Sequence, residues 1–273
     1  MQRRRFVTLM GVGATGALAV RSSKGLAAQG KWRPDGVGSL ARIGVLTPDF
    51  DPVPESEMWA MAPRGVSVHA SRVSRHAGSF ADAPHVDGAA ELLAGLAPRV
   101  IVYAYTSSSY APGAEADDAL RVRLETRTRG IPVVLTAPAA SEALRILDVH
   151  RVALVHPPWF TEELNDKGSG YFRARGLEVV SCARLTPARR FAEVAPAELY
   201  DWTKANVPRK AEAVFIGGNG LRAIAVIGAL EETLGRPVLT ANQVAFWQAL
   251  QLVGMSLKVR QYGRIFTRQV AER

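Results

Sequence analysis

Residues 214–222, with the sequence VFIGGNGLR, decide the fold that this chain is expected to adopt. The apolar run before the glycines is typical of a strand that is covered on both faces of a parallel sheet. Gly217, Gly218 and Gly220 let the backbone take positive φ and approach a ligand closely. A helix expected from Leu221 would direct free N–H groups into the turn. Open α/β sheets bind ligands in such turns, although a plain strand-to-helix connection is the simpler alternative.

An earlier segment follows the same pattern. Residues 100–110 (VIVYAYTSSSY) also form an apolar run that ends in small and hydroxylic residues. After each segment come a further expected strand and then a helix. This internal repeat predicts two similar α/β halves that place both turns in one cleft, with the helix at residues 244–252 packed back between the halves.

Strands and helices alternate along the rest of the chain. Strands are expected at residues 42–48, 66–73, 99–105, 131–137, 151–157, 177–185, 213–217 and 237–241. Helices are expected at residues 58–62, 87–96, 114–129, 141–148, 161–175, 196–206, 221–234 and 244–252, the fifth interrupted near Gly168 and Gly170. The alternation predicts an α/β fold of parallel sheets with right-handed crossovers. An N-terminal lobe is expected at residues 41–138, completed by residues 243–273, and a C-terminal lobe at residues 139–242, after a lead-in at residues 29–40.

Composition favours an ordinary globular protein. The chain has 273 residues, of which 48% are apolar and 22% charged, and its formal net charge is +9. Residues 1–28 hold five basic residues and no acidic one, so the remainder carries 29 basic against 25 acidic residues. These bases are scattered and form no patch with aromatic residues, so nucleic acid is not an expected partner. The single cysteine excludes an intrachain disulfide and a cysteine-rich metal site.

Residues 1–28 have the features of an export signal. Residues 3–6 (RRRF) fit the twin-arginine pattern. The apolar stretch at residues 7–20 is too short and too rich in glycine for a stable membrane span, and Ala27 and Ala28 offer a cleavage site. The twin-arginine export machinery is therefore an expected partner, and the mature protein is expected in the periplasm or outside the cell. An uncleaved anchor or a misassigned start is the alternative.

Few side chains suggest chemistry by themselves. None of the five histidines has a metal-ligand spacing with another histidine, the cysteine or a carboxylate, so no metal site is expected. His156, at a strand end, is interpreted as a non-catalytic residue at the mouth of the cleft, with a catalytic role as the alternative. Cys182 falls inside a strand and is interpreted as a buried, inert thiol. The serines at residues 107–109 could supply donors to a carboxylate or form only a turn.

Five motifs spread over residues 42–266 carry a family resemblance. They are RIGVLTP at 42–48, YTSSS at 105–109, GNGL at 218–221, PVL at 237–239 with FW at 246–247, and YGRIF at 262–266. They resemble the aspartate/glutamate racemase superfamily, and within it the arylmalonate decarboxylase and maleate isomerase group. The resemblance implies two lobes related by a pseudo-twofold axis, each with a four-stranded parallel sheet flanked by helices, and a site between them.

The resemblance also implies a chemistry without metal or organic cofactor. In this family a cysteine at one or both of the facing turns moves a proton beside a carboxylate or adds to a double bond, while N–H and hydroxyl groups hold an enediolate. Tyr105 and Gly218 occupy the two cysteine positions here, and Trp159 lies near the place of a family aromatic hydroxyl. Tyr105 is therefore the expected proton donor, since its ordinary pKa near 10 suits an acid better than a base.

The leading hypothesis is an exported decarboxylase-like or isomerase-like protein that acts on a small carboxylic acid, expected to be a dicarboxylate, through an enediolate. The residues expected to contact this ligand are Thr106, Ser107, Gly218, Asn219, Gly220, Pro48 and Trp159. Because both family cysteines are replaced, a non-catalytic periplasmic carboxylate-binding protein is the alternative. A partner-binding protein with an occluded cleft is a third reading.

Overall fold

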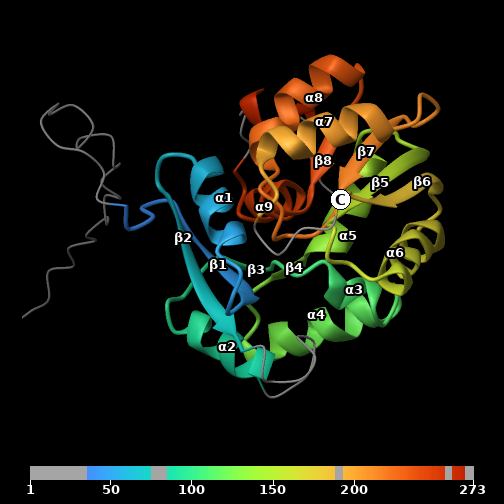
Figure 1. Cartoon of the computed structure of the whole chain (residues 1–273). Helices are drawn as coiled ribbons and strands as arrows, with labels where there is room; N and C mark the ends of the chain where they lie inside the picture. Colours follow the sequence, from blue (N-terminus) through green and yellow to red (C-terminus); the bar gives the residue numbers. More distant parts are fainter. Residues whose placement is uncertain (1–35, 75–84, 188–192, 256–259, 268–273) are drawn as a thin grey trace, which may run out of the picture. The chain divides into compact units, whose positions relative to one another are not determined.

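The computed structural model describes residues 36–74, 85–187, 193–255 and 260–267 (Figure 1). They belong to one compact unit, Gly36–Arg273. The expected export signal at residues 1–28 lies outside the described residues. Among the helices that are described, none combines the length and the apolar character that crossing a membrane requires.

The described strands form two parallel sheets of four strands each, as the sequence predicts. The first sheet has the order β2-β1-β3-β4 and the second the order β6-β5-β7-β8. The strands of the first are β1 (Ala41–Pro48), β2 (Val66–Val73), β3 (Val100–Tyr103) and β4 (Val133–Leu135); those of the second are β5 (Arg151–His156), β6 (Glu178–Arg184), β7 (Ala213–Ile216) and β8 (Val238–Thr240). Because both sheets repeat one order, β3 and β7 occupy equivalent places, and so do the turns that follow them.

The helices pack against both faces of each sheet. They are α1 (Val53–Met61), α2 (His85–Ala94), α3 (Ser107–Tyr110), α4 (Ala116–Arg127), α5 (Thr136–Ile146), α6 (Glu162–Ala174), α7 (Pro196–Asn206), α8 (Ile227–Leu234) and α9 (Ala241–Leu252), with short 3-10 turns η4 (Ile224–Val226), η5 (Arg260–Tyr262) and η6 (Arg264–Thr267). Helices α2 and α4 lie over one face of the first sheet, and α7 and α8 lie over one face of the second (Figure 1). Strands β3 and β7 are buried along their whole length, which explains their unbroken apolar sequence.

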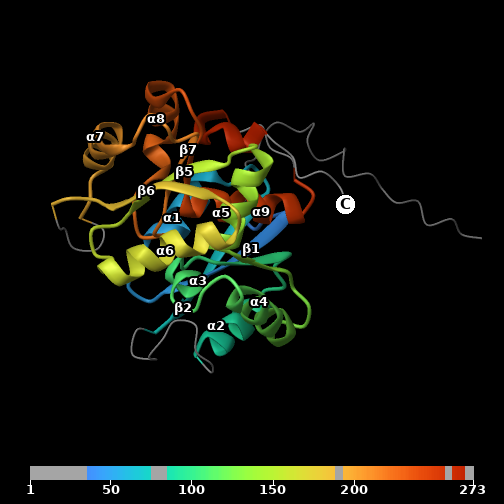
Figure 2. The same cartoon turned by 90° about the vertical axis from the view of Figure 1, so that its right-hand side faces the viewer.

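Helix α9 links the two sheets, as the repeat predicts. It packs beside α5 and also contacts β3, β4 and β8 (Figure 2). Its side chains are buried almost all round, including Phe246 and Trp247, so the helix lies inside a core that both sheets share.

The expected boundaries between β4 and α5 and between β8 and α9 are wrong. The sequence predicts strands to residues 137 and 241 and helices from residues 141 and 244, but the helices begin directly after the strands, at Thr136 and Ala241. Polar side chains hold both junctions: the Thr136 hydroxyl donates to the carbonyl of Tyr103 (3.1 Å), and Gln243 Oε1 accepts the N–H of Thr240 (3.0 Å). These bonds satisfy backbone groups where strand pairing stops.

The expected interruption of α6 at Gly168 and Gly170 is also wrong, because the helix runs through both residues. A Cβ atom at Gly168 would lie 2.7 Å from the Tyr110 ring and 2.8 Å from the His156 ring. Gly168 therefore lets the helix pack closely on two aromatic rings, and tertiary packing outweighs its low helix propensity.

Candidate functional site

A cavity of about 190 Å³ lies at the carboxyl ends of β1, β3, β5 and β7. Its lining includes all eight residues that the sequence singles out: Pro48, Tyr105, Thr106, Ser107, Trp159, Gly218, Asn219 and Gly220. The two turns expected to share a cleft therefore do lie in one cavity. The sequence did not single out the other four lining residues, Phe50, Asp51, Phe160 and Leu164. The roles of all these residues toward a ligand stay predictions.

Thr106 joins the two turns directly. Its backbone N–H and its hydroxyl both donate to Asn219 Oδ1, at 2.8 and 2.7 Å. The same hydroxyl accepts the N–H of Gly218 at 3.3 Å. Thr106 and Asn219 are buried, so their hydrogen bonds replace contacts that water would otherwise make. In this structure Thr106 holds the opposite turn in place, and its expected role as a donor to a ligand stays a prediction.

Asn219 anchors the glycine turn from inside the protein. Its Nδ2 donates to the Thr136 hydroxyl (3.2 Å) and to Asn242 Oδ1 (2.8 Å), and Asn242 Nδ2 donates back to the Asn219 carbonyl (2.8 Å). In the described part of the chain, the backbone N–H groups of Asn219 and Gly220 donate to no acceptor. Both residues line the cavity, so these two N–H groups are the donors that the turn offers to an anion.

Gly218 is required by the shape of this turn. Its φ is +88°, a conformation that disfavours any side chain, and a Cβ atom would lie 2.5 Å from Pro157 Cγ. The position that carries a cysteine in the resembling family therefore has no room for a side chain in this arrangement of the turn.

The expectation that a helix from Leu221 would direct its N–H groups into this turn is wrong. The 3-10 turn η4 begins only at Ile224, and α8 begins at Ile227. The N–H groups of Ala223 and Ile224 donate instead to Glu57 Oε1, at 2.7 and 3.0 Å. Glu57 comes from α1, and its Oε2 accepts from Asn242 Nδ2 (2.8 Å). A buried carboxyl group thus takes the donors that the sequence assigned to the ligand, and burial raises its pKa to about 7.

Asp51 is the one carboxyl group among the described lining residues of the cavity. It lies between β1 and α1 and is 3% exposed. Its Oδ1 accepts the N–H of Val53 (3.0 Å). Burial raises its pKa to about 6, against the opposing effects of this hydrogen bond and of the charge of Arg72. In the sequence, Asp51 is recognisable only as an aspartate in a proline-rich loop after the first strand. Because such a residue is usually exposed, sequence reasoning did not place it in the site.

Tyr105 and Ser107, like Thr106, are lining residues that carry a hydroxyl group. Burial raises the pKa of Tyr105, a hydrogen bond with Ser107 lowers it, and the charge of Asp51 raises it. The tyrosine hydroxyl therefore holds its proton more tightly than a free phenol. Ser108 and Ser109 are not among the lining residues of the cavity. Both are buried, and the Ser108 hydroxyl donates to the Tyr105 carbonyl (2.7 Å).

His156 is fully buried, so its interpretation as a residue at the cleft mouth is wrong. Its Nδ1 lies 2.9 Å from Asn165 Oδ1 and its Nε2 3.3 Å from the Tyr110 hydroxyl. Burial lowers its pKa to about 4, which keeps the ring neutral. Cys182 is half-buried and its thiol contacts the Asn165 carbonyl (3.3 Å); burial raises its pKa to about 12. Neither side chain lines the cavity.

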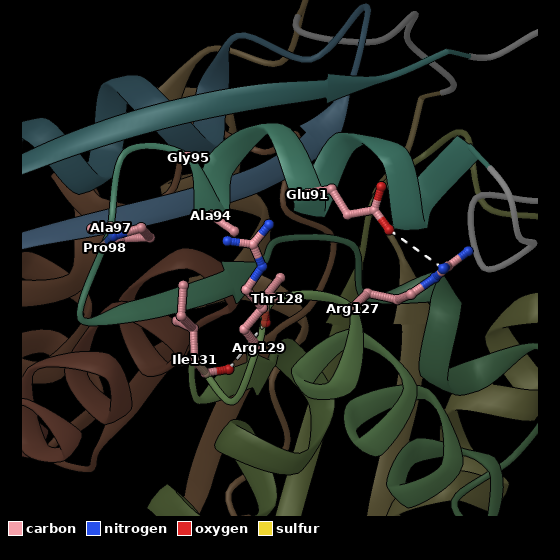
Figure 3. Close-up of a pocket in the computed structure, with 9 residues that line it drawn as sticks. All are labelled: Glu91, Ala94, Gly95, Ala97, Pro98, Arg127, Thr128, Arg129 and Ile131. Carbon is pink, nitrogen blue, oxygen red and sulfur yellow. Dashed lines mark hydrogen bonds and ion pairs between the residues drawn. The ribbon is translucent and has the colours of Figure 1, made fainter.

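A larger cavity, of about 600 Å³, lies elsewhere on the first sheet (Figure 3). Its lining includes Pro98 and Ile131, which precede β3 and β4, so it opens at the amino ends of these strands. Arg127 and Glu91 form an ion pair across it (3.5 Å). Parallel α/β sheets bind ligands at the carboxyl ends of their strands, which favours the smaller cavity as the functional site.

Comparisons with known proteins identify the family of the chain. The family model of arylmalonate decarboxylase matches residues 71–266. An arylmalonate decarboxylase of Bordetella bronchiseptica is 30% identical over 166 residues, which cover 59% of this chain and 68% of that protein.

Solved structures give the same result for the fold. The structure of unliganded arylmalonate decarboxylase has a TM-score of 0.72 and 27% identity, and the match covers 83% of this chain and 99% of that chain. The maleate isomerase of Pseudomonas putida S16 has a TM-score of 0.74 at 22% identity, covering 83% of this chain and 98% of that chain, which concerns the fold alone. The two equivalent parallel sheets have the Asp/Glu racemase-like arrangement, and the facing turns lie in one cavity. From the family model and the relative that match it, the chain belongs to the arylmalonate decarboxylase family.

Proposed function

We propose that this protein binds a small dicarboxylic acid in the 190 Å³ cavity and converts it through an enediolate, by loss of one carboxylate or by isomerisation. One observation carries the proposal. A single cavity is lined by residues from four strand ends of both sheets, and the sequence predicts that these residues contact the ligand. Family membership supports the same class of reaction.

The cavity lining offers two kinds of groups to such a ligand. The Ser107 hydroxyl and the N–H groups of Asn219 and Gly220 suit a carboxylate and the oxygens of an enediolate. The apolar lining residues, Phe50, Trp159, Phe160 and Leu164, suit an aryl or alkyl substituent. No lysine, arginine or histidine is among the described lining residues, so neutral donors would hold the anion.

Decarboxylation is the branch that the lining residues favour. Addition to a double bond needs a nucleophile such as a thiol, and the one cysteine of the chain, Cys182, does not line the cavity. Decarboxylation needs donors for the enediolate and one acid that returns a proton to carbon. The sequence assigns this acid to Tyr105, and its raised pKa makes it a weak acid for the purpose.

A non-catalytic carboxylate-binding protein is the second candidate. The absence of a thiol from the described lining of the cavity supports it, while the donors of the glycine turn serve either function.

Proton NMR of the protein with phenylmalonate, maleate and short dicarboxylates in D₂O distinguishes the two functions. Enzyme-dependent formation of a monocarboxylate that carries one deuterium beside its carboxylate is the expected result. Line broadening of a dicarboxylate without any product would instead establish the binding protein. Tyr105→Phe, which removes the hydroxyl and keeps the ring, tests the sequence-based assignment: if Tyr105 donates the proton, turnover is abolished while binding persists.

We further propose that residues 1–28 direct export by the twin-arginine route. The RRRF sequence at residues 3–6 and the apolar stretch at residues 7–20 support this. Cell fractionation checks it: the protein is expected in the periplasmic fraction, and lysines in place of Arg3 and Arg4 should retain it in the cytoplasm.

A further inference from the structure

Asp51 combines three properties that the proposed reaction needs in an acid. It lines the cavity that also contains Tyr105, Ser107 and the glycine turn. It is 3% exposed, so bulk water hardly reaches it. The Val53 N–H fixes one carboxyl oxygen at 3.0 Å, and the N–H of Asp51 itself donates to the Pro48 carbonyl (3.1 Å), so the side chain is held in place at the cavity wall.

We infer that the Asp51 carboxyl group, rather than the Tyr105 hydroxyl, supplies the proton that a carbon atom of the substrate takes up in this cavity. The inference rests on the proposed function, and it deepens that proposal by naming the acid that stands in for the family thiol.

The surroundings of Asp51 let it keep its proton to a higher pH than a free aspartate does. Desolvation raises its pKa to about 6. The cation that faces it is Arg72 on β2, whose guanidinium donates to the Asp51 carbonyl and is also paired with Glu55 (2.6 Å). The other titratable groups that it influences are Glu57 on α1 and Tyr105 after β3, and both are acids. A dicarboxylate in the cavity would add negative charge beside Asp51 and raise its pKa further.

A local turn before α1 is the simpler explanation of Asp51, and it accounts for part of the geometry. An aspartate side chain commonly accepts the backbone N–H two residues further along the chain, as Asp51 does from Val53. Such a turn requires only an ionised or polar oxygen, however, and forms equally well at the surface. It does not explain why the carboxyl group is buried at the wall of a cavity where charge is disfavoured.

The step balances with the groups present. In a substituted malonate, the bond between the central carbon and one carboxylate breaks, CO₂ leaves, and the electron pair stays as an enediolate on the remaining carboxylate. The Asp51 O–H bond then breaks, and its proton forms the new C–H bond. Asp51 is left as a carboxylate and regains a proton from solvent, so the reaction consumes one proton per CO₂ released.

The test compares four forms of the full-length protein acting on phenylmalonate: wild type, Asp51→Asn, Tyr105→Phe and Asp49→Asn. Asp49 is a neighbouring, exposed acid that does not line the cavity, so its variant is the matched control. The inference predicts a loss of kcat of at least about 100-fold in Asp51→Asn with KM changed less than about threefold, and a loss below about tenfold in Tyr105→Phe. In the wild type, kcat/KM should fall as pH rises above about 6, the pKa of Asp51 in the free protein, and Asp51→Glu should keep part of the activity with a shifted pH profile.

Each outcome decides a different point. Turnover of Asp51→Asn equal to that of Asp49→Asn would overturn the role of Asp51 and leave the proposed function standing. Abolished turnover in Tyr105→Phe beside an active Asp51→Asn would return the role to Tyr105. A wild-type protein that converts neither phenylmalonate nor maleate would overturn the proposed function, and the role of Asp51 with it.

Discussion

The turns after β3 and β7 occupy equivalent places in the two sheets but contribute different chemistry. The first, residues 104–107, leads within a few residues into α3 and brings side chains to the cavity, with Thr106 and Ser107 among them. The second, residues 217–220, bends at Gly218 with positive φ and brings backbone N–H groups. One repeated architecture thus supplies hydroxyl groups from one side and peptide groups from the other.

This difference teaches how the cavity is held together. The turn with side chains donates twice to Asn219 and accepts the N–H of Gly218, so Thr106 holds the glycine turn at two neighbouring residues. A chain of buried polar contacts continues from Asn219 through Asn242 to Glu57 on α1. The site therefore depends on contacts between segments more than a hundred residues apart in sequence.

The largest effect should follow from removing the link between the turns. Asn219→Ala deletes the acceptor of two Thr106 donors and the donor to Asn242, and leaves these groups buried without partners. We expect the free energy of unfolding to fall by about 3 kcal/mol, measured by urea denaturation. Asn206→Ala is the control, since Asn206 is exposed and its side chain donates to the nearby Trp202 carbonyl; it should change stability by less than about 0.5 kcal/mol. Similar losses in both variants would contradict the linking role.

A smaller effect should separate backbone strain from crowding at the glycine turn. Gly218→Ala and Gly235→Ala both place a side chain at positive φ, but a Cβ at Gly235 meets no atom within 4 Å, whereas one at Gly218 meets Pro157 at 2.5 Å. We expect Gly235→Ala to lower the free energy of unfolding by about 1 kcal/mol and Gly218→Ala by about 1–3 kcal/mol more. Gly218→Cys should be destabilised like Gly218→Ala. If thermal melting showed equal losses at both glycines, Pro157 would not restrict the turn.

The smallest effect concerns the pH dependence of stability through Glu57. Its pKa rises from 4.5 to about 7 on folding, so the folded protein holds this proton more tightly and loses stability as pH rises towards 7. Asp51 acts in the same direction up to about pH 6, and His156 acts oppositely between about pH 4 and 6.5. Between pH 6.5 and 7.5 mainly Glu57 titrates, and the free energy of unfolding should fall by about 0.7 kcal/mol.

Glu57→Gln should flatten this slope, whatever its stability at any one pH. The control is Glu178→Gln, which changes an exposed carboxyl group of β6 and should leave the slope as in the wild type. An unchanged slope in Glu57→Gln would show that Glu57 is not the group that titrates in this window.

The sequence predicted most of the lining of the cavity because turn positions follow from local patterns. An apolar run that ends in glycine or hydroxylic residues marks the end of a buried strand, and parallel strands bring such ends together. This reasoning found Thr106 and Asn219. It missed Asp51, whose position depends on how α1 folds back after β1, and it misplaced His156, since no local pattern distinguishes a buried histidine from one at a cleft mouth.

By itself, the sequence determined the two parallel sheets and the equivalence of the turns, because alternation of apolar runs and turns is a local property that strand and helix periodicity impose. Only the tertiary structure decided which groups remain available in the site. Glu57 accepts hydrogen bonds from the N–H groups of Ala223 and Ile224, and Asn219 accepts them from Thr106. Burial raises the pKa of Asp51 to about 6. Hydrogen-bond partners and desolvation depend on segments that are distant in the chain, and these set the chemistry of the cavity.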